Sequence, residues 1–191
     1  MPADSKGRFE QAYNAQAAVE IESRLIVGQH VTQDTNDTHQ FVPTGEAITP
    51  VVASATEALI DSGFGSEAAI TRFEKDDTGQ PTGLMILPAV KREHHGGSVE
   101  QLEARPDPSP QFEDELFRQR LAHRTATQSG RARDKQRQQT VEPVFGISKA
   151  ALGFRRFPLR GVANVSLEWS LVCSADNLKR LHHLMTVIQP A

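Results

Sequence analysis

Two apolar runs near the start of the chain have the composition of β-strands. They cover Phe9–Val19 and Arg24–Val31, and the polar segment Glu20–Ser23 joins them. Strand-like runs separated by a short polar connection are typical of a β-hairpin. Tyr13, the only tyrosine, is interpreted as a packing residue of this hairpin.

The next segment predicts helices and a short buried strand. Asn36 or Asp37 is expected to cap a helix whose apolar residues begin at Phe41, although Pro43 and Pro50 would split it. The apolar run 58–60 ends on Asp61, and Ser66 then starts a helix that runs to about residue 75. An acid at the carboxyl end of a buried strand is a common ligand position, although the pattern around Asp61 by itself favours a turn residue.

The second half of the chain predicts a strand, an insertion and helices. Residues 83–90 fit a central strand, and 91–110 are rich in charge, Gly and Pro, as expected of a mobile insertion. His94 and His95 are interpreted as exposed loop residues without a metal. The last helix, 163–187, has an apolar stripe expected to face the core, made of Leu167, Leu171, Leu178, Leu181 and Leu184.

Composition narrows the class of protein. The 191 residues suffice for one domain with a core, and the hydrophobic content is 38%. No apolar run approaches the roughly 20 residues that span a bilayer, and the N-terminus lacks a signal-peptide core. Cys173 is the only cysteine, so it is expected to be a buried thiol. We therefore expect a cytoplasmic protein without membrane contact.

The charge is strongly uneven along the chain. Residues 118–160 hold eleven Lys and Arg against two acids, whereas residues 1–117 hold eight Lys and Arg against twenty acids. This asymmetry predicts a polyanionic partner, and a solvated charged face is the alternative. In a helix over 140–152, Glu142 and Lys149 lie two turns apart on one face, and Arg137 precedes them. Such a carboxylate can bind a divalent metal beside a cation that binds phosphate.

The segment 153–161, GFRRFPLRG, interleaves two phenylalanines with three arginines. In one interpretation the arginines contact a DNA backbone while the aromatics stack on bases. In the other, the aromatics point inward and the arginines are only solvated. The sequence leaves both open.

Six segments, in order, resemble the DDE transposases of bacterial insertion sequences, in the group with a Tyr-Arg-Glu-Lys motif. They are FEQAYNAQAAVE, RLIVGQHVTQDTND, LIDSGFGSE, QTVEPVFG, GFRRFPLRG and EWSLVCSADNLKRLH. Together they cover most of residues 8–184, with 76–130 the least similar part. The resemblance corresponds to the C-terminal part of the family's catalytic domain.

The resemblance implies an α/β, RNase H-like fold in which two acids on strands and one on a late helix converge. Asp61 then matches the second acid and Glu142 the third, and two Mg²⁺ (or Mn²⁺) ions about 3.5–4 Å apart would support phosphodiester cleavage and strand transfer at the ends of the element. Double-stranded DNA would be the partner, with a homo-oligomer possible. The implied DNA contacts are Arg137, Lys149, Arg155, Arg156 and Arg160.

Two departures from the family pattern change the expected activity. The motif's tyrosine, eight residues before Glu142, is replaced by Asp134, which puts negative charge on the DNA path. The first acid belongs on a strand before the hairpin, where this chain begins, and neither Asp4 nor Asp34 is expected to replace it. We therefore expect one partial catalytic domain over 1–191 that lacks its first strand, with parts 8–90, an insertion 91–135, and 136–191.

Three functions remain open at this point. The first is a transposase catalytic domain, truncated and inactive by itself. The second is a catalytically silent DNA-binding or regulatory fragment of a transposase, and the third is an RNase H-like nuclease unrelated to transposition. Metal-dependent nicking would favour catalysis, whereas binding with a steep salt dependence and no cleavage would favour the silent fragment.

Overall fold

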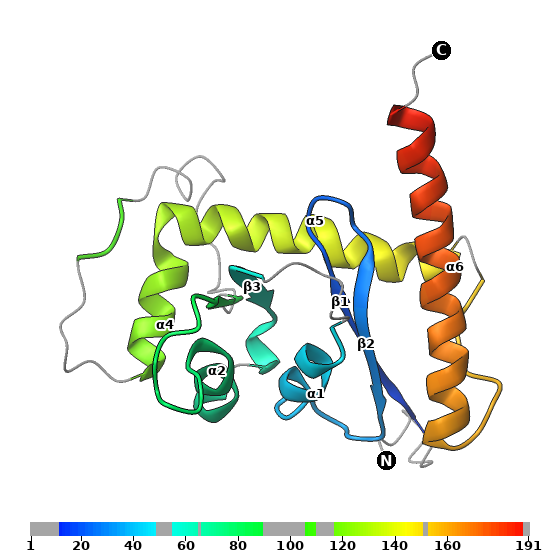
Figure 1. The fold of residues 1–191 in the computed structure, drawn as a ribbon, viewed down its shortest axis with the longest axis horizontal. Coiled ribbons are helices and arrows are strands. Elements are labelled where there is room, and N and C mark those ends of the chain that lie inside the picture. Colours follow the sequence, from blue (N-terminus) through cyan, green and yellow to red (C-terminus); the bar gives the residue numbers. More distant parts are fainter. Residues whose placement is uncertain are drawn as a thin grey trace, which may run out of the picture. The chain divides into compact units, whose positions relative to one another are not determined.

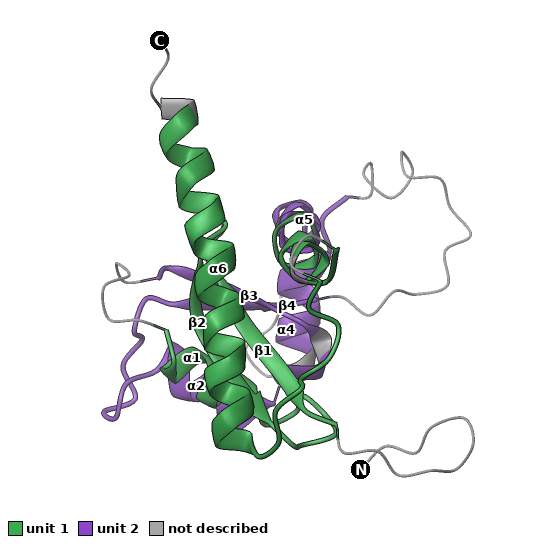
Figure 2. Ribbon diagram, turned by 90° about the vertical axis from the view of Figure 1, so that its right-hand side faces the viewer, with its two compact units in different colours: residues 1–53, 139–191 green, residues 54–138 purple. Residues whose placement is uncertain are grey.

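The computed structural model describes residues 12–48, 55–64, 66–89, 106–109, 117–150 and 153–188. Figure 1 shows its helices and strands in the order of the sequence. Contacts divide the chain into two compact units, which have different colours in Figure 2. Unit 1 combines residues 1–53 with 139–191, and unit 2 is residues 54–138. Almost all of the predicted insertion at 91–110, including His94 and His95, lies outside the described residues.

Unit 1 contains the expected hairpin. Strand β1 (Asn14–Val19) pairs antiparallel with β2 (Ile26–Thr32), with a register shift between Ala18 and Val19. The connection is closed by the carboxylate of Glu20, which accepts hydrogen bonds from the backbone N–H groups of Glu22 and Ser23 at 3.0 and 2.6 Å. The hairpin prediction is confirmed.

Helix α6 (Val162–Ile188) packs along β2 and completes the core of unit 1. The face that packs is not the predicted one: the leucines at 167, 171 and 178 are 66%, 72% and 68% exposed. Helix α6 has apolar residues on two opposite faces. The face with small and aromatic side chains is the one that packs against the hairpin. The buried cluster of unit 1 is Ile26, Val31, Val144, Val165, Trp169 and Cys173.

Helix α1 (Phe41–Glu46) is short, and its predicted cap is wrong. The N-cap position is Gln40, which makes no side-chain capping bond. Asp37 serves the hairpin instead, since its Oδ1 accepts hydrogen bonds from the side-chain amides of Asn14 and Gln16 at 2.7 and 2.8 Å. Residues 57–60 form a strand, as the apolar run 58–60 predicts.

Unit 2 is built around a parallel pair of strands, β3 (Glu57–Ile60) and β4 (Met85–Pro88). Between them, η1 (Ser62–Phe64) leads to helix α2 (Glu67–Glu74). Ser66 caps α2 as predicted, with its side chain accepting a hydrogen bond from Ala69 N at 3.3 Å. Parallel strands need such a crossover connection, because a tight hairpin can join only antiparallel neighbours.

Two helices follow β4 in the described chain, α4 (Phe117–Ala126) and α5 (Gln128–Ala150). The helix expected from residue 140 is therefore the second half of a longer helix, with Pro143 inside it. Residues 128–138 of α5 belong to unit 2, and 139–150 belong to unit 1. The fold is α/β, as predicted. No helix in the described part of the chain has the length and apolar character needed to cross a membrane.

Candidate nucleic-acid interface

The segment 153–161, here called the arginine loop, separates its aromatic from its charged side chains. Phe154 and Phe157 pack against the core of unit 1, with ring centroids 6.3 and 6.4 Å from that of Trp169. Arg155, Arg156 and Arg160 are exposed. Of the two interpretations of this segment, the structure has the one with the aromatics inward, so neither phenylalanine is placed to stack on a base.

Contacts with distant parts of unit 1 hold the arginine loop at its C-terminal end. The backbone N–H of Gly161 donates to the hydroxyl of Tyr13 at 2.8 Å, and the Tyr13 ring meets Phe157 edge-on at 6.0 Å. Glu168 accepts a hydrogen bond from Leu159 N at 3.3 Å, and the amide of Asn164 donates to Arg160 O at 2.9 Å. The three guanidinium groups therefore project from a backbone that is anchored to the hairpin and to α6.

The loop also depends on two glycines at its ends. Gly153 and Gly161 have φ values of 67° and 83°, in the left-handed region. Residues with a Cβ rarely adopt this conformation, so glycine is the residue suited to both positions. Backbone geometry therefore explains why a glycine stands at each end of this segment of arginines and phenylalanines, independently of any ligand.

Glu142 and Lys149 lie in unit 1, on the α5 segment that precedes the loop. Both side chains are exposed, whereas Val144 between them is buried and Phe145 stacks on Trp169 at 5.9 Å with an interplanar angle of 11°. The helix predicted for these residues is confirmed. Their roles in metal and phosphate binding stay predictions.

Arg137 takes part in an internal ion pair. Its Nε lies 3.1 Å from Oδ1 of Asp134, and the side-chain amide of Gln138 donates to the other carboxylate oxygen at 3.4 Å. The negative charge of Asp134, expected to oppose DNA, is therefore offset by a cation one turn away. A contact between Arg137 and DNA stays a prediction.

Several other cations of the basic segment also have partners within unit 2. Arg124 bridges the elements around β4, with Nη1 at 2.5 Å from Glu74 Oε1 and 3.4 Å from Ile86 O. Arg133 reaches Glu57 on β3, with 3.2 Å between Nε and Oε2. Part of the charge asymmetry along the sequence therefore stabilises the packing of α4 and α5 in this unit.

Asp61 occupies the position that the sequence predicts, directly after the last residue of β3. Its carbonyl accepts a hydrogen bond from Phe64 N at 3.0 Å, which closes the turn of η1, and its side chain is exposed. Asp61 belongs to unit 2 and Glu142 to unit 1, so the structure describes the two proposed ligands in separate units.

The two-metal site implied by the resemblance would combine Asp61 of unit 2 with Glu142 of unit 1. Among the described residues, no group of three or more His, Cys, Asp or Glu side chains could hold a metal ion. The Mg²⁺ (or Mn²⁺) cofactor therefore stays a prediction.

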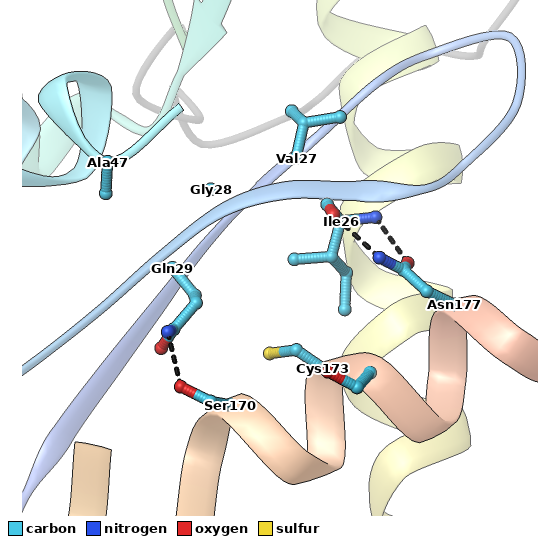
Figure 3. A pocket seen from close by; sticks show the side chains of 9 residues that line it. Ile26, Val27, Gly28, Gln29, Ala47, Ser170, Cys173 and Asn177 are labelled. Atoms are coloured by element: carbon cyan, nitrogen blue, oxygen red, sulfur yellow. Dashed lines mark hydrogen bonds between the residues drawn. The ribbon is translucent and has the colours of Figure 1, made fainter. Parts of the chain in front are cut away.

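A hollow lies between β2 and α6 in unit 1, with a volume of about 310 Å³ (Figure 3). On one wall, the side-chain amide of Asn177 forms two hydrogen bonds of 2.8 Å with the backbone of Ile26 in β2. Its oxygen accepts from Ile26 N, and its nitrogen donates to Ile26 O. On another, the amide of Gln29 donates to Ser170 Oγ at 2.6 Å. Burial raises the pKa of the Cys173 thiol to about 12, with a further contribution from the Asp176 carboxylate. The thiol is thus not a nucleophile at neutral pH.

Tyr13 and Glu168 are the functional positions that sequence reasoning missed. Tyr13 is a packing residue, as predicted, but its hydroxyl also anchors a loop 148 residues away in sequence. Glu168 binds the same loop through its carboxylate. No local pattern signals either contact, because both partners are set by the packing of α6 against the hairpin.

The described fold is thus α/β, with an anchored loop of exposed arginines next to a helix that carries an exposed acid. Residues 105–182 match the family model of the transposase DDE domain. This match supports a relation to the C-terminal part of DDE transposases and a transposition-related function. The match includes three of the six similar segments. No curated protein and no solved structure matches the chain.

Proposed function

We propose that the arginine loop is a DNA-backbone contact of this transposase. The observation that carries the proposal is the separation within the loop: Phe154 and Phe157 are packed inward, whereas Arg155, Arg156 and Arg160 are exposed. Guanidinium groups on an anchored backbone can form two parallel hydrogen bonds with a phosphate. Because the aromatic side chains face the core, we expect binding that tracks phosphates without reading bases.

Lys149 is proposed as a further contact to the same backbone. It lies at the end of α5, four residues before the loop begins, and is exposed like the three arginines. An ammonium group acts on phosphate as a point charge, which adds affinity without geometric selectivity. Arg137 is the weakest member of the predicted set, because DNA would have to compete with Asp134 for its guanidinium.

For catalysis, we propose that Asp61 and Glu142 are the second and third acids of an RNase H-like site that needs a further acid-bearing strand. Two positions support this proposal: Asp61 directly follows β3, and Glu142 lies on α5. Two carboxylates are too few to clamp two metal ions. We therefore propose that the chain alone binds DNA without cleaving it, and that Asp61→Ala or Glu142→Ala abolishes cleavage in an intact enzyme.

The DNA contact is tested by the salt dependence of binding. The affinity of the purified chain for a labelled duplex of mixed sequence is measured at several salt concentrations, for the natural chain and for Arg155→Ala/Arg156→Ala. The plot of log K against log salt should become shallower by about 0.9 for each phosphate that the variant no longer neutralises. The matched control is Lys75→Ala/Lys179→Ala, which removes two exposed cations elsewhere and should keep the slope.

Circular dichroism shows whether each variant keeps its fold. A folded Arg155→Ala/Arg156→Ala variant that binds with the natural affinity and slope would rule out the arginine loop as the contact. An equal loss of affinity in the control variant would mean that only net charge matters.

The second candidate function is regulatory: a DNA-binding chain without activity that occupies element ends. The specific observation in its favour is the set of exposed arginines on an anchored loop, which can bind DNA without any catalytic step. Both candidates predict the same result in the binding experiment. They differ in whether the site gains activity when a further acid-bearing strand is supplied.

A further inference from the structure

Helix α6 exposes a continuous apolar stripe on the side opposite its core contacts. The stripe, here called the leucine stripe, consists of Leu167, Leu171, Ser174, Leu178, Leu181 and Met185. Its large members are between 42% and 72% exposed, and Ser174 is exposed as well. The opposite face of the same helix holds Val165, Trp169 and Cys173 in the core.

The spacing within the leucine stripe selects a helix as its occupant. Consecutive members are separated by four, three, four, three and four residues. An apolar repeat of 3.5 residues is the a/d pattern of a coiled coil, in which side chains of one helix insert between those of another. The stripe covers 19 residues, or about 28 Å of helix at about 1.5 Å per residue.

The leucine stripe presents a large area of apolar surface to water. Five large side chains, each between 42% and 72% exposed, present on the order of 400 Å² of apolar area. This is near the size of the largest apolar patch of a typical monomer. It is also the right size for the apolar centre of an interface that buries about 800 Å² on each partner.

We propose that the leucine stripe is a self-association surface on which α6 of a second copy of this chain packs antiparallel. A two-fold axis across the helix makes one stripe self-complementary, so no other partner is needed. The antiparallel layers pair Leu167 with Met185, Leu171 with Leu181, and Ser174 with Leu178. The small Ser174 then faces the large Leu178 in both central layers, whereas a parallel pair would set Ser174 against itself and leave a gap.

Charge agrees with the same orientation. In the antiparallel arrangement the positions beside the stripe bring Glu168 of one helix near His182 of the other, at both ends of the contact, and such flanking pairs set helix orientation in coiled coils. Both residues lie in α6 on the same flank of the stripe, and His182 is exposed. In a parallel pair, neither of them would lie beside the other.

The proposal is tested first by the mass of the full-length chain in solution. Sedimentation at protein concentrations from about 1 to about 100 µM brackets a micromolar dissociation constant. We expect a monomer–dimer equilibrium, and Leu178→Glu should raise its Kd at least about a hundredfold, because each dimer buries that side chain twice. The matched control, His183→Glu, places the same charge on an exposed position of α6 away from the stripe and should keep the natural Kd.

Cross-linking tests the orientation. In Leu171→Cys/Leu181→Cys, oxidation should join position 171 of one copy to position 181 of the other, and trypsin separates the two positions by cutting after Lys179 and Arg180. The buried thiol of Cys173, whose pKa is about 12, does not compete. Bonds from 171 to 171 and from 181 to 181 would show a parallel pair and overturn the antiparallel assignment.

Two results would overturn the surface itself. One is a monomer at every concentration, or a dimer equally weakened by His183→Glu and Leu178→Glu. The other is a monomer in which Leu178→Cys is protected from maleimide, since another segment of the same chain would then cover the stripe. DNA binding is measured separately, so a failure to dimerise and a failure to bind DNA are distinguishable.

Discussion

At the residue scale, Asp176 is the group whose environment most clearly opposes its charge. It lies on the core-facing side of α6 and is 4% exposed. Burial raises the pKa of its carboxyl above the usual 3.8, and the nearby Lys179 opposes this shift. Removing a carboxylate from water disfavours the ionised form, so the folded chain holds this proton more tightly than the unfolded chain does.

This shift has a defined sign for stability. A raised folded pKa makes the folded state most favourable below the unfolded value of 3.8, and the advantage is lost as pH rises through the folded pKa. Asp176→Asn removes the ionisation while keeping the size of the side chain. We therefore expect the variant to be more stable than the natural chain at neutral pH, with the difference disappearing below about pH 3.8.

Urea unfolding at pH 3 and pH 7 checks this expectation, with Asp77→Asn, an exposed acid, as the control. A variant that is less stable at both pH values by the same amount would show that Asp176 acts through hydrogen bonding and not through its charge.

At the element scale, α5 contains two glycines with opposite surroundings. A Cβ on Gly130 would lie 2.8 Å from Thr125 Cα and 2.9 Å from Thr125 C, in the backbone at the end of α4. A Cβ on Gly146 would meet nothing within 4 Å. The first glycine is required by the close approach of two helices, whereas the second only weakens its helix.

The two alanine variants should therefore shift stability in opposite directions. Gly130→Ala should lower the free energy of unfolding by about 1–3 kcal/mol, because the backbone must move apart. Gly146→Ala should raise it by about 0.5–1 kcal/mol, because alanine is the better helix former. Denaturant unfolding of both variants measures this, and a shift of the same sign in both would contradict the described junction of α4 and α5.

The element scale also shows why the leucine prediction was wrong. Leucines at helical spacing are a sound signal for a buried face, but α6 has a second apolar face formed by Val165, Trp169 and Cys173. Both faces satisfy the helical period. The choice between them depended on which one fits the hairpin, where the indole of Trp169 donates to Gln16 O at 3.0 Å and Asn177 pairs with Ile26.

At the scale of the whole molecule, the uneven charge has two uses. Some cations of the basic segment form ion pairs with acids of the preceding half, as Arg124 does with Glu74 and Arg133 with Glu57. Others, in the arginine loop, are exposed. The net charge of residues 118–160 thus overstates what is available to a polyanion, since paired cations contribute less to phosphate binding than exposed ones.

The whole chain should bind DNA without cleaving it. Incubation with supercoiled plasmid in Mg²⁺ or Mn²⁺ is expected to leave the plasmid intact, because the proposed site has two acids, Asp61 and Glu142, and these are too few to clamp two metal ions. The measurement is conversion of the plasmid to its nicked form on an agarose gel, with binding by the same preparation as the positive control. Nicking that requires metal and is lost in Glu142→Gln would instead assign cleavage to this chain.

The sequence by itself determined the local features: the hairpin, the Ser66 cap, the strand that ends at Asp61, the helix that carries Glu142, and the resemblance that a family model supports over 105–182. These depend on neighbours in sequence, where propensity and capping act. Tertiary structure alone decided which face of α6 is buried, that Phe154 and Phe157 point inward, and that Arg137 pairs with Asp134. Such choices depend on shape and on partners far away in the chain, which periodicity does not encode.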